Sequence, residues 1–332
     1  MLLKKSHITS QSGSIIIGLL FIFLANFSYS QDKKLIEKSA LIMGSTFHIS
    51  VVSTDSIQAN IAIDEAFEEM KRIEFLISEW IPETQISQVN QQAGIRPVKV
   101  DFEVFKLTQR ALQYSKLSNG AFDISIAAMD RIWDFSGFMD SLPSPKEIKQ
   151  SVRNVDYQKI LLNPQDTTIF LKDIGMKIGF GSIGKSYAAD KAKEVLQAKG
   201  IESGIVNASG DMAIWGKPIN EKKWKIGIKN PFKRHGVAKV LRLNHSSIAT
   251  SGSYEKFVEI NNTRYGHIIN PKTGMPSTGL TSVTVYGPST EFANALSTSI
   301  MVMGKKEGKK LLKKFPQYKG VFITDSGKII KI

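Results

Sequence analysis

Two glycine-rich loops of this chain carry residues that are suited to chemistry on a phosphate group. Residues 179–186 match the G-x-x-x-x-G-K-[ST] pattern of nucleotide-binding loops and include Lys185. Residues 266–274 carry His267 among glycine and proline residues. The first loop offers backbone N–H groups and a cation to an anion, and the second offers an imidazole that can accept a proton. Together they predict a ligand that bears phosphate.

By itself the first loop predicts a P-loop nucleotide hydrolase, and three features oppose that function. The strand that should precede the loop, residues 176–180, is short and interrupted by Lys177 and Gly179. No parallel βαβ alternation surrounds the loop, and the N-terminal segment predicts export away from ATP. The local physics remains, because a glycine-rich turn at a helix N-terminus favours an anion whose charge Lys185 can neutralise.

His267 is the best candidate for a general base among the five histidines. It lies in a loop rich in glycine and proline rather than on an apolar stripe, so core packing does not explain it. A lone histidine is more often structural than catalytic, and a structural role for His267 stays open at this level.

The elements that must position these loops alternate irregularly between helix and strand. Periodic apolar residues predict helices over 63–76, 104–114, 184–200 and 291–303, with a basic helix over 305–315, and strands over 46–52, 160–162, 168–171, 204–207, 224–229, 237–243 and 282–286, with a final hairpin of 321–324 and 328–332. This mixture lacks regular βαβ units and predicts an α+β fold.

Composition excludes several functional classes. The 332 residues contain no cysteine, which excludes disulfides, thiolate nucleophiles, cysteine-bound zinc, iron–sulfur clusters and a lipoprotein anchor. Any metal site must therefore use oxygen or histidine ligands. The net charge of +14 is typical of nucleic-acid binding, but export argues against that partner. The densest lysine cluster, over 305–314, predicts the solvated face of an amphipathic helix, and it also favours anionic ligands and peripheral contact with anionic membranes.

The first thirty residues have the layout of a secretory signal peptide. Lys4 and Lys5 precede an apolar run over 15–25, and small residues at 28 and 30 suit cleavage before Gln31. The alternative is an uncleaved N-terminal anchor, although the run is short for a membrane span. We therefore expect a signal peptide over 1–30, a single domain over 31–332, and an exported protein of the periplasm or cell envelope.

Seven further segments occur in an order and spacing that resemble the ApbE family, the FAD:protein FMN transferases. They are residues 43–46 (Met-Gly-Ser-Thr), 77–84 (Ile-Ser-Glu-Trp-Ile-Pro-Glu-Thr), 120–125 (Gly-Ala-Phe-Asp-Ile-Ser), 206–211 (Val-Asn-Ala-Ser-Gly-Asp), 249–254 (Ala-Thr-Ser-Gly-Ser-Tyr), 266–274 (Gly-His-Ile-Ile-Asn-Pro-Lys-Thr-Gly) and 293–298 (Ala-Asn-Ala-Leu-Ser-Thr). Each segment is a weak signal alone. The resemblance runs from about Met43 to Gly304, which is most of the chain.

The resemblance implies an α+β, T-fold-like architecture with an FAD cleft between two subdomains. Such enzymes bind FAD as substrate with Mg²⁺, split its pyrophosphate, and attach FMN through a phosphoester to a threonine of an exported or membrane-bound redox protein; some relatives mainly hydrolyse FAD. By similarity the FAD site includes Met43, Trp80, Ala121, Phe122, Asp123, Gly179, Lys185, Ile268 and Thr273. For Trp80 and Phe122 the alternative is core packing.

The implied metal ligands are the main-chain carbonyl of Ser182 and the side chains of Asn294 and Thr298, and two positions depart from the family pattern. The family has aspartate where this chain has Gly179 and Asn294. Because Mg²⁺ prefers charged oxygen, we expect weaker metal binding unless the FAD phosphates or Asp211 compensate. A second hypothesis follows, in which the protein binds FAD on the same scaffold with little or no turnover.

Overall fold

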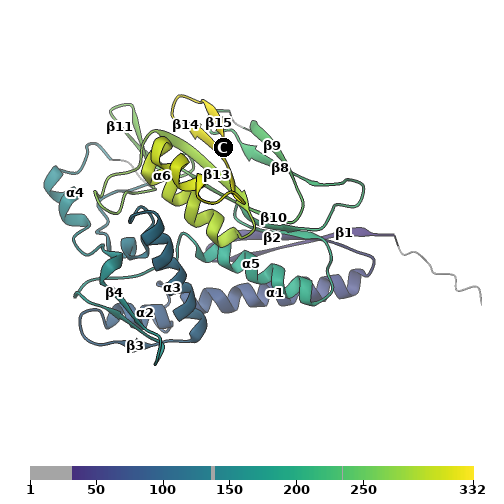
Figure 1. The fold of residues 1–332 in the computed structure, drawn as a ribbon, viewed down its shortest axis with the longest axis horizontal. Helices are drawn as coiled ribbons and strands as arrows, with labels where there is room; N and C mark the ends of the chain where they lie inside the picture. The colour runs from purple at the N-terminus through teal and green to yellow at the C-terminus, as the bar shows by residue number, and fades with distance from the viewer. Residues whose placement is uncertain (1–31, 136–138, 234) are drawn as a thin grey trace, which may run out of the picture. The chain divides into compact units, whose positions relative to one another are not determined.

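Strands with alternating burial build one eight-stranded sheet in which every neighbouring pair is antiparallel. The computed structural model describes residues 32–135, 139–233 and 235–332 (Figure 1). Lys33–Ile332 form one compact unit, while the predicted signal peptide lies outside the described residues. In sheet order the strands are β1 (Lys34–Ile42), β2 (Ser45–Ser53), β6 (Gly204–Ala208), β7 (Asp211–Trp215), β10 (Ser246–Gly252), β13 (Leu280–Gly287), β14 (Lys319–Thr324) and β15 (Ile329–Lys331).

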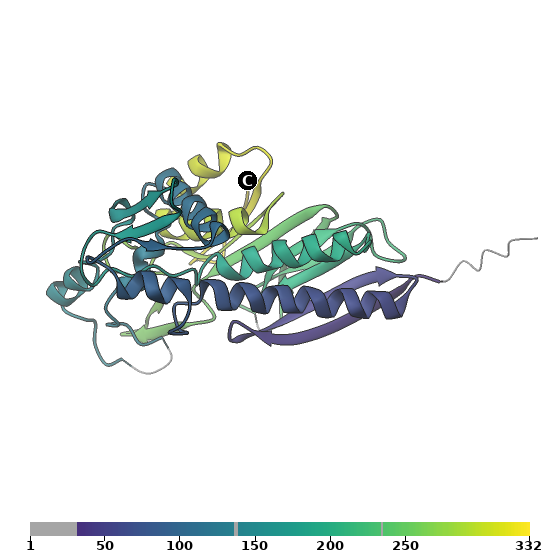
Figure 2. The same cartoon turned by 90° about the horizontal axis from the view of Figure 1, so that it is seen from below.

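Three long helices cover one face of this sheet. They are α1 (Ser56–Ile77), α5 (Gly184–Ala198) and α6 (Thr290–Lys313). α1 and α5 run side by side along β1, β2, β6 and β7, and α6 packs on β10 and β13 (Figure 2). Their apolar stripes bury residues at helical spacing, such as Ile63, Met70 and Ile73 of α1, against inward residues such as Phe47 of β2.

The opposite face is covered by a hairpin of β8 (Trp224–Lys229) and β9 (Val237–Leu243). β8 alternates buried and exposed residues along its whole length, and Trp224 packs with Ile214 of the large sheet. Neighbouring residues of β7 therefore pack on opposite faces of the sheet: Ala213 packs against the helices and Ile214 against the hairpin. The result is a helix, sheet and hairpin sandwich that matches the predicted α+β class.

Smaller elements gather at one end of the helical layer. A three-stranded sheet packs with helices from the segment between α1 and α5 (Figure 1). The elements of this segment are α2 (Gln85–Gln91), β3 (Val98–Lys99), α3 (Phe102–Leu117), α4 (Pro145–Ser151), β4 (Ile160–Asn163) and β5 (Thr168–Leu171). Later in the chain comes the hairpin of β11 (Phe257–Ile260) and β12 (Thr263–Gly266). Among the described residues, no helix combines the length and apolar composition needed to cross a bilayer.

The predicted helices and strands are confirmed, with two helices joined into one, while three strands of the large sheet were not predicted. The predicted helices over 291–303 and 305–315 are one element, α6, that is broken at Gly304 with φ 74°. Its basic half buries Leu311 and Leu312 and exposes most of its lysines, as expected. β1, β7 and β10 were not predicted, because β1 and β10 mix polar residues into their pattern and β7 follows β6 after a tight turn at positive φ (Ser209 and Gly210).

Candidate active site

Segments that are far apart in the sequence line one cavity of ≈ 240 Å³ at the edge of the helical layer. Of the predicted site residues, Ala121, Phe122, Asp123, Gly179, Ser182 and Thr298 lie on its wall. The other lining residues are Glu79, Ile124, Ile126, Ala127, Gly181, Ile269 and Pro271. The structure therefore joins the loop after α3, the loop before α5, the His267 loop and helix α6 in one place.

The side chains of Ser182, Asn294 and Thr298, the residues of the predicted metal site, are hydrogen-bonded to one another. Ser182 Oγ donates to Asn294 Oδ1 at 2.8 Å and lies 3.1 Å from Thr298 Oγ1. Thr298 Oγ1 in turn donates to Asn294 Oδ1 at 3.5 Å, since the two residues are one helical turn apart on α6. The Ser182 hydroxyl therefore links the loop before α5 to both α6 residues.

Asp211 sets the orientation of the Asn294 amide. Asn294 Nδ2 donates to Asp211 Oδ2 at 2.9 Å, so Oδ1 faces Ser182 and Thr298. Ser186 Oγ of α5 and the backbone N–H of Thr250 donate to the same carboxylate. Burial raises the pKa of Asp211 to about 6 despite these hydrogen bonds. Asp211 is thus a buried negative charge directly behind the predicted metal ligands.

Helix α6 is held in place at its N-terminus by a carboxylate from α5. Asp190 accepts the backbone N–H groups of Thr290 and Glu291 at 2.9 and 3.1 Å, and Ser289 Oγ donates to it at 3.0 Å. A carboxylate at this end also complements the helix dipole. This contact fixes the position of Asn294, one turn further along α6, relative to the loop before α5.

Glu291 provides a second anchor for α6. Its carboxylate accepts from the Arg110 guanidinium at 2.8 Å and from the Tyr114 hydroxyl at 2.8 Å, both on α3. Burial and the Glu291 charge raise the pKa of Tyr114, which keeps its hydroxyl a donor. The cavity wall contributed by α6 is therefore tied to both α5 and α3.

Lys185 lies beside the turn that contains Met43. Its Nζ donates to Ser45 Oγ at 2.6 Å, and burial lowers its pKa while Asp211 opposes the shift. Met43 has φ 51° in the tight turn between β1 and β2, where its N–H donates to Glu74 Oε1 at 2.9 Å. Neither residue lines the cavity itself, although Asp211 links Lys185 electrostatically to the Asn294 cluster.

The loop after α3 is held by Asp123. Its buried carboxylate accepts from Ser125 N and Oγ at 2.8 and 2.6 Å and from Tyr157 N at 3.1 Å, while burial raises its pKa. Phe122 is 2% exposed and packs edge-on against the Tyr114 ring, so core packing describes most of its side chain. The carboxylate of Asp123, a residue of the predicted FAD site, therefore already accepts three hydrogen bonds within the protein.

Trp80 has the opposite environment. Its side chain is 71% exposed, with the Arg131 guanidinium 5.1 Å from the ring centroid. The core-packing alternative is wrong for Trp80, which leaves a large aromatic face open to a ligand.

The loop that carries His267 is stiffened by its own turn. Asn270 accepts the N–H groups of Thr273 and Gly274 through its carbonyl and that of Lys272 through its side chain. Thr273 is exposed and Ile268 is half-buried. His267 reaches solvent, with Nδ1 3.3 Å from the Lys256 carbonyl oxygen.

Phe135 packs edge-on against the His267 ring, with 6.5 Å between the ring centroids. Desolvation by the surrounding atoms lowers the pKa of His267, with the Lys256 carbonyl opposing. A neutral imidazole at neutral pH is suited to accept a proton, which keeps the general-base prediction for His267.

No strand precedes the phosphate-loop pattern, since residues 176–183 are irregular before α5 begins at Gly184. The loop is instead paired with the segment after α1: Asn90 Oδ1 accepts Ile178 N at 2.7 Å and Asn90 Nδ2 donates to Ile178 O. A P-loop needs a strand here, so the structure supports the arguments against a nucleotide hydrolase.

Glu79 occupies the space beside Gly179. A Cβ at position 179 would lie 2.6 Å from Glu79 Oε1 and 3.1 Å from Ala127 Cβ. The Phe180 backbone N–H donates to the Glu79 carboxylate, whose pKa is raised by burial. The departure at Gly179 thus coincides with a carboxylate that enters the same space from another segment.

The donor set fits Mg²⁺ in kind, because hydroxyl, amide and main-chain oxygens are hard ligands. Within the described ranges, no cluster of three carboxylate or histidine side chains could hold a metal ion. A cation would therefore be held by neutral oxygens of Ser182, Asn294 and Thr298, with carboxylates nearby and substrate phosphates completing the site.

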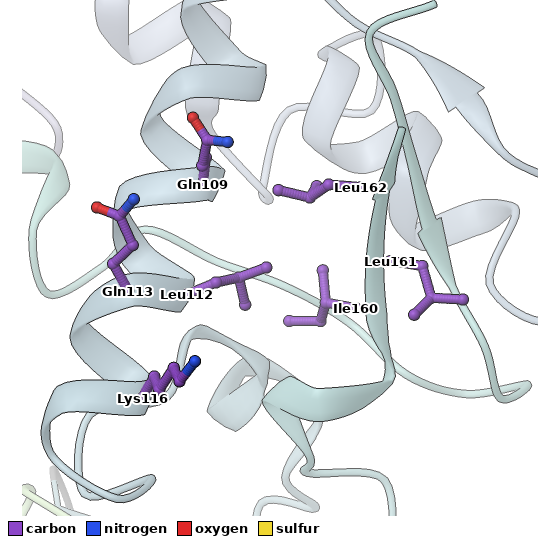
Figure 3. Close-up of a pocket in the computed structure, with 7 residues that line it drawn as sticks. All are labelled: Gln109, Leu112, Gln113, Lys116, Ile160, Leu161 and Leu162. Atoms are coloured by element: carbon purple, nitrogen blue, oxygen red, sulfur yellow. The ribbon is translucent and has the colours of Figure 1, made fainter. Parts of the chain in front are cut away.

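A second depression, of ≈ 370 Å³, lies between α3 and β4, away from all predicted site residues (Figure 3). Leu112 and Ile160 point toward each other across it, and its lining is mostly apolar. It provides no cluster of groups for phosphate chemistry.

A comparison with known families decides the relationship of this chain. The model of the ApbE family matches residues 43–322. The chain belongs to the ApbE family. The resemblance recognised from the seven sequence segments is confirmed.

Several relatives share most of their length with this ApbE protein. FAD:protein FMN transferases of Treponema pallidum and Klebsiella pneumoniae are each 29% identical to it, over 86% and 90% of this chain and 83% and 92% of their own. The solved ApbE protein of Thermotoga maritima has a TM-score of 0.81 at 29% identity, covering 90% of this chain and 97% of its own. The apo flavinyl transferase ApbE of Pseudomonas stutzeri has a TM-score of 0.78 at 25% identity, covering 90% and 94%.

Sequence reasoning missed two carboxylates of this ApbE site. Glu79 was passed over beside Trp80, and Asp190 was read only as part of a helix. An acidic residue inside a matched segment was the available signal for Glu79. For Asp190 there was none, because its partners lie 100 residues away.

Proposed function

We propose that this protein is an FAD:protein FMN transferase. The observation that carries the proposal is the family match over 43–322, together with relatives of that name which align over most of both chains. The cavity supports it, because it joins the glycine-rich loop, α6 and the His267 loop, and its largely apolar wall also includes the polar residues Ser182 and Thr298.

The reaction transfers a phosphoryl-linked group between oxygens. The acceptor threonine Oγ forms a bond to the FMN phosphorus, the anhydride P–O bond breaks, and AMP leaves with that oxygen. The threonine proton goes to His267, whose depressed pKa keeps it unprotonated at neutral pH. Lys185, which interacts electrostatically with Asp211, would offset the negative charge of the phosphates.

The residues that would hold Mg²⁺ are Ser182, Asn294 and Thr298, and the ion would neutralise charge on the pyrophosphate. Asp211 keeps Asn294 Oδ1 aimed at the other two. Because Asn294 is uncharged, we propose weaker metal affinity than a carboxylate would give, in part restored by nearby acidic groups.

We further propose that the protein acts outside the cytoplasm on a threonine-containing redox protein. The support is the signal-like sequence over 1–30. The exposed lysines of the second half of α6 suit contact with an anionic membrane surface where such an acceptor is anchored.

The test incubates purified protein with FAD, Mg²⁺ and a threonine-containing acceptor peptide, followed by mass spectrometry. We expect the peptide to gain the mass of FMN, with loss of the adduct when His267 is replaced by asparagine. The second candidate, a protein that binds FAD with little or no turnover, is favoured by Asn294. FAD binding without any peptide adduct or FMN release would establish that candidate instead.

A further inference from the structure

Glu79 is a carboxylate of the cavity whose charge has no evident structural use. It lies between α1 and α2, lines the cavity with Ser182 and Thr298, and is half-buried. Throughout residues 32–135, 139–233 and 235–332, no Lys, Arg or His forms an ion pair with it. Most other carboxylates near the site, such as Glu291 and Asp190, are held by several donors.

An unpaired, half-buried carboxylate is costly unless a cation offsets it. Glu79 Oε1 lies 2.6 Å from where a Cβ of residue 179 would be, so the carboxylate reaches the loop that leads to Ser182. On the same cavity wall are the hydroxyls of Ser182 and Thr298. All of these side chains offer hard oxygen donors. Two residues that line the cavity, Glu79 and Asp123, have carboxylates, and that of Asp123 already accepts three hydrogen bonds within the protein.

We propose that Glu79 supplies the negative charge of the divalent-cation site, directly or through a bound water. The inference rests on the proposed function, because the cation that Glu79 would serve is the one that would neutralise charge on the FAD pyrophosphate. Asp211 has a different role: its oxygens are taken by Ser186, Asn294 and Thr250, so it orients an amide while Glu79 faces the cavity.

A merely structural role for Glu79 is to accept the Phe180 N–H. Glu79→Gln separates the two roles, because glutamine keeps the size and an acceptor oxygen but removes the charge. The matched control is Glu83→Gln, an exposed glutamate in the same segment. Calorimetric titration of Mn²⁺ and Mg²⁺ into the FAD-loaded protein measures cation affinity without reference to turnover.

We expect Glu79→Gln to weaken cation affinity about 10- to 100-fold, with unchanged unfolding midpoint, and Glu83→Gln to leave both unchanged. Equal cation affinity in Glu79→Gln and the unmodified protein would overturn this inference and leave the transferase proposal standing. Absence of FAD binding in the unmodified protein would overturn both.

A second set of three variants moves the carboxylate from residue 79 to the neighbouring position 179. Gly179 does not have a left-handed backbone, so aspartate fits there once Glu79 is shortened and Ala127, whose Cβ would lie 3.1 Å from the new Cβ, shifts slightly. We expect Glu79→Ala to lose cation affinity and Glu79→Ala with Gly179→Asp to recover most of it. Gly179→Asp alone should unfold at a lower midpoint, because its Cβ meets Glu79. No recovery in a folded double variant would count against the proposal.

Discussion

Replacing Asn294 by aspartate tests how charge is shared behind the metal ligands. In the structure Asn294 Nδ2 donates to Asp211 Oδ2 at 2.9 Å. The substitution would put a carboxylate oxygen at the place of that amide nitrogen, directly beside the Asp211 carboxylate. The same substitution supplies the charged oxygen that Mg²⁺ prefers. The variant should therefore be less stable alone and bind metal more tightly.

The loss of stability in Asn294→Asp equals the smaller of two free-energy costs: repulsion between the two carboxylates, or protonation of one of them. Two unit charges about 3 Å apart repel by about 5 kcal/mol at an effective dielectric constant of about 20. Protonating Asp211, whose pKa is about 6, costs about 3 kcal/mol at about pH 8. Proton uptake is cheaper, so it sets the loss of stability in the variant.

The sign of the pH dependence follows from proton binding. The folded variant holds an extra proton on the pair, while the unfolded chain does not near neutral pH, so stability falls as pH rises. The difference from the unmodified protein should be small below about pH 6 and reach about 3 kcal/mol, or about 5 °C in unfolding midpoint, near pH 8.

The assay is thermal unfolding of both proteins over this pH range, with and without Mg²⁺ and FAD. The control is Asn163→Asp, which adds the same charge at an exposed turn where the side-chain oxygen still accepts from Gln165 N. We expect Mg²⁺ with FAD to remove most of the deficit of Asn294→Asp. Equal midpoints for Asn294→Asp and the unmodified protein near pH 8 without Mg²⁺ would refute the reasoning.

Three other predictions follow from the same geometry. Asp190→Ala removes the acceptor for two N–H groups at the start of α6, so the free energy of unfolding should drop by about 2 kcal/mol, and a denaturant titration unchanged by the substitution would contradict this. His267 has a lowered pKa, so the rate of FMN transfer should rise with pH through a value below the ordinary 6.5 and then stay level; a pH–rate profile checks it, and a midpoint above 6.5 would exclude this imidazole as the base. Trp80→Ala should weaken FAD binding about tenfold at an unchanged unfolding midpoint, because the ring is 71% exposed; an FAD titration with unaltered affinity would show that the ring does not contact the ligand.

The predictable part of the fold was the part with long, regular periodicity. α1 buries Ile63, Met70 and Ile73 at helical spacing, and a helix that long is specified by its own stripe. β10 was missed because its residues are small and polar and are buried only by the strands and helix around them. Local pattern cannot show burial that neighbouring elements impose.

The same division holds in the site. Several features of the site are properties of single segments and could be predicted from the sequence. They are the glycine-rich loop, His267 and the spacing of Asn294 and Thr298. The seven segments in order also specified the family, because order and spacing are linear information.

Only the tertiary structure decided which charges act together. Asn294 and Asp211 are 83 residues apart, and they meet because β7 enters the sheet beneath the start of α6. Glu79 and Gly179 belong to segments that neither periodicity nor motif relates. The fold brings them together on the wall of one cavity, where the Glu79 carboxylate fills the space beside Gly179. Electrostatic interaction depends on distance in space, so a sequence can name its ionisable groups while only the packing of α1, α5 and α6 pairs them.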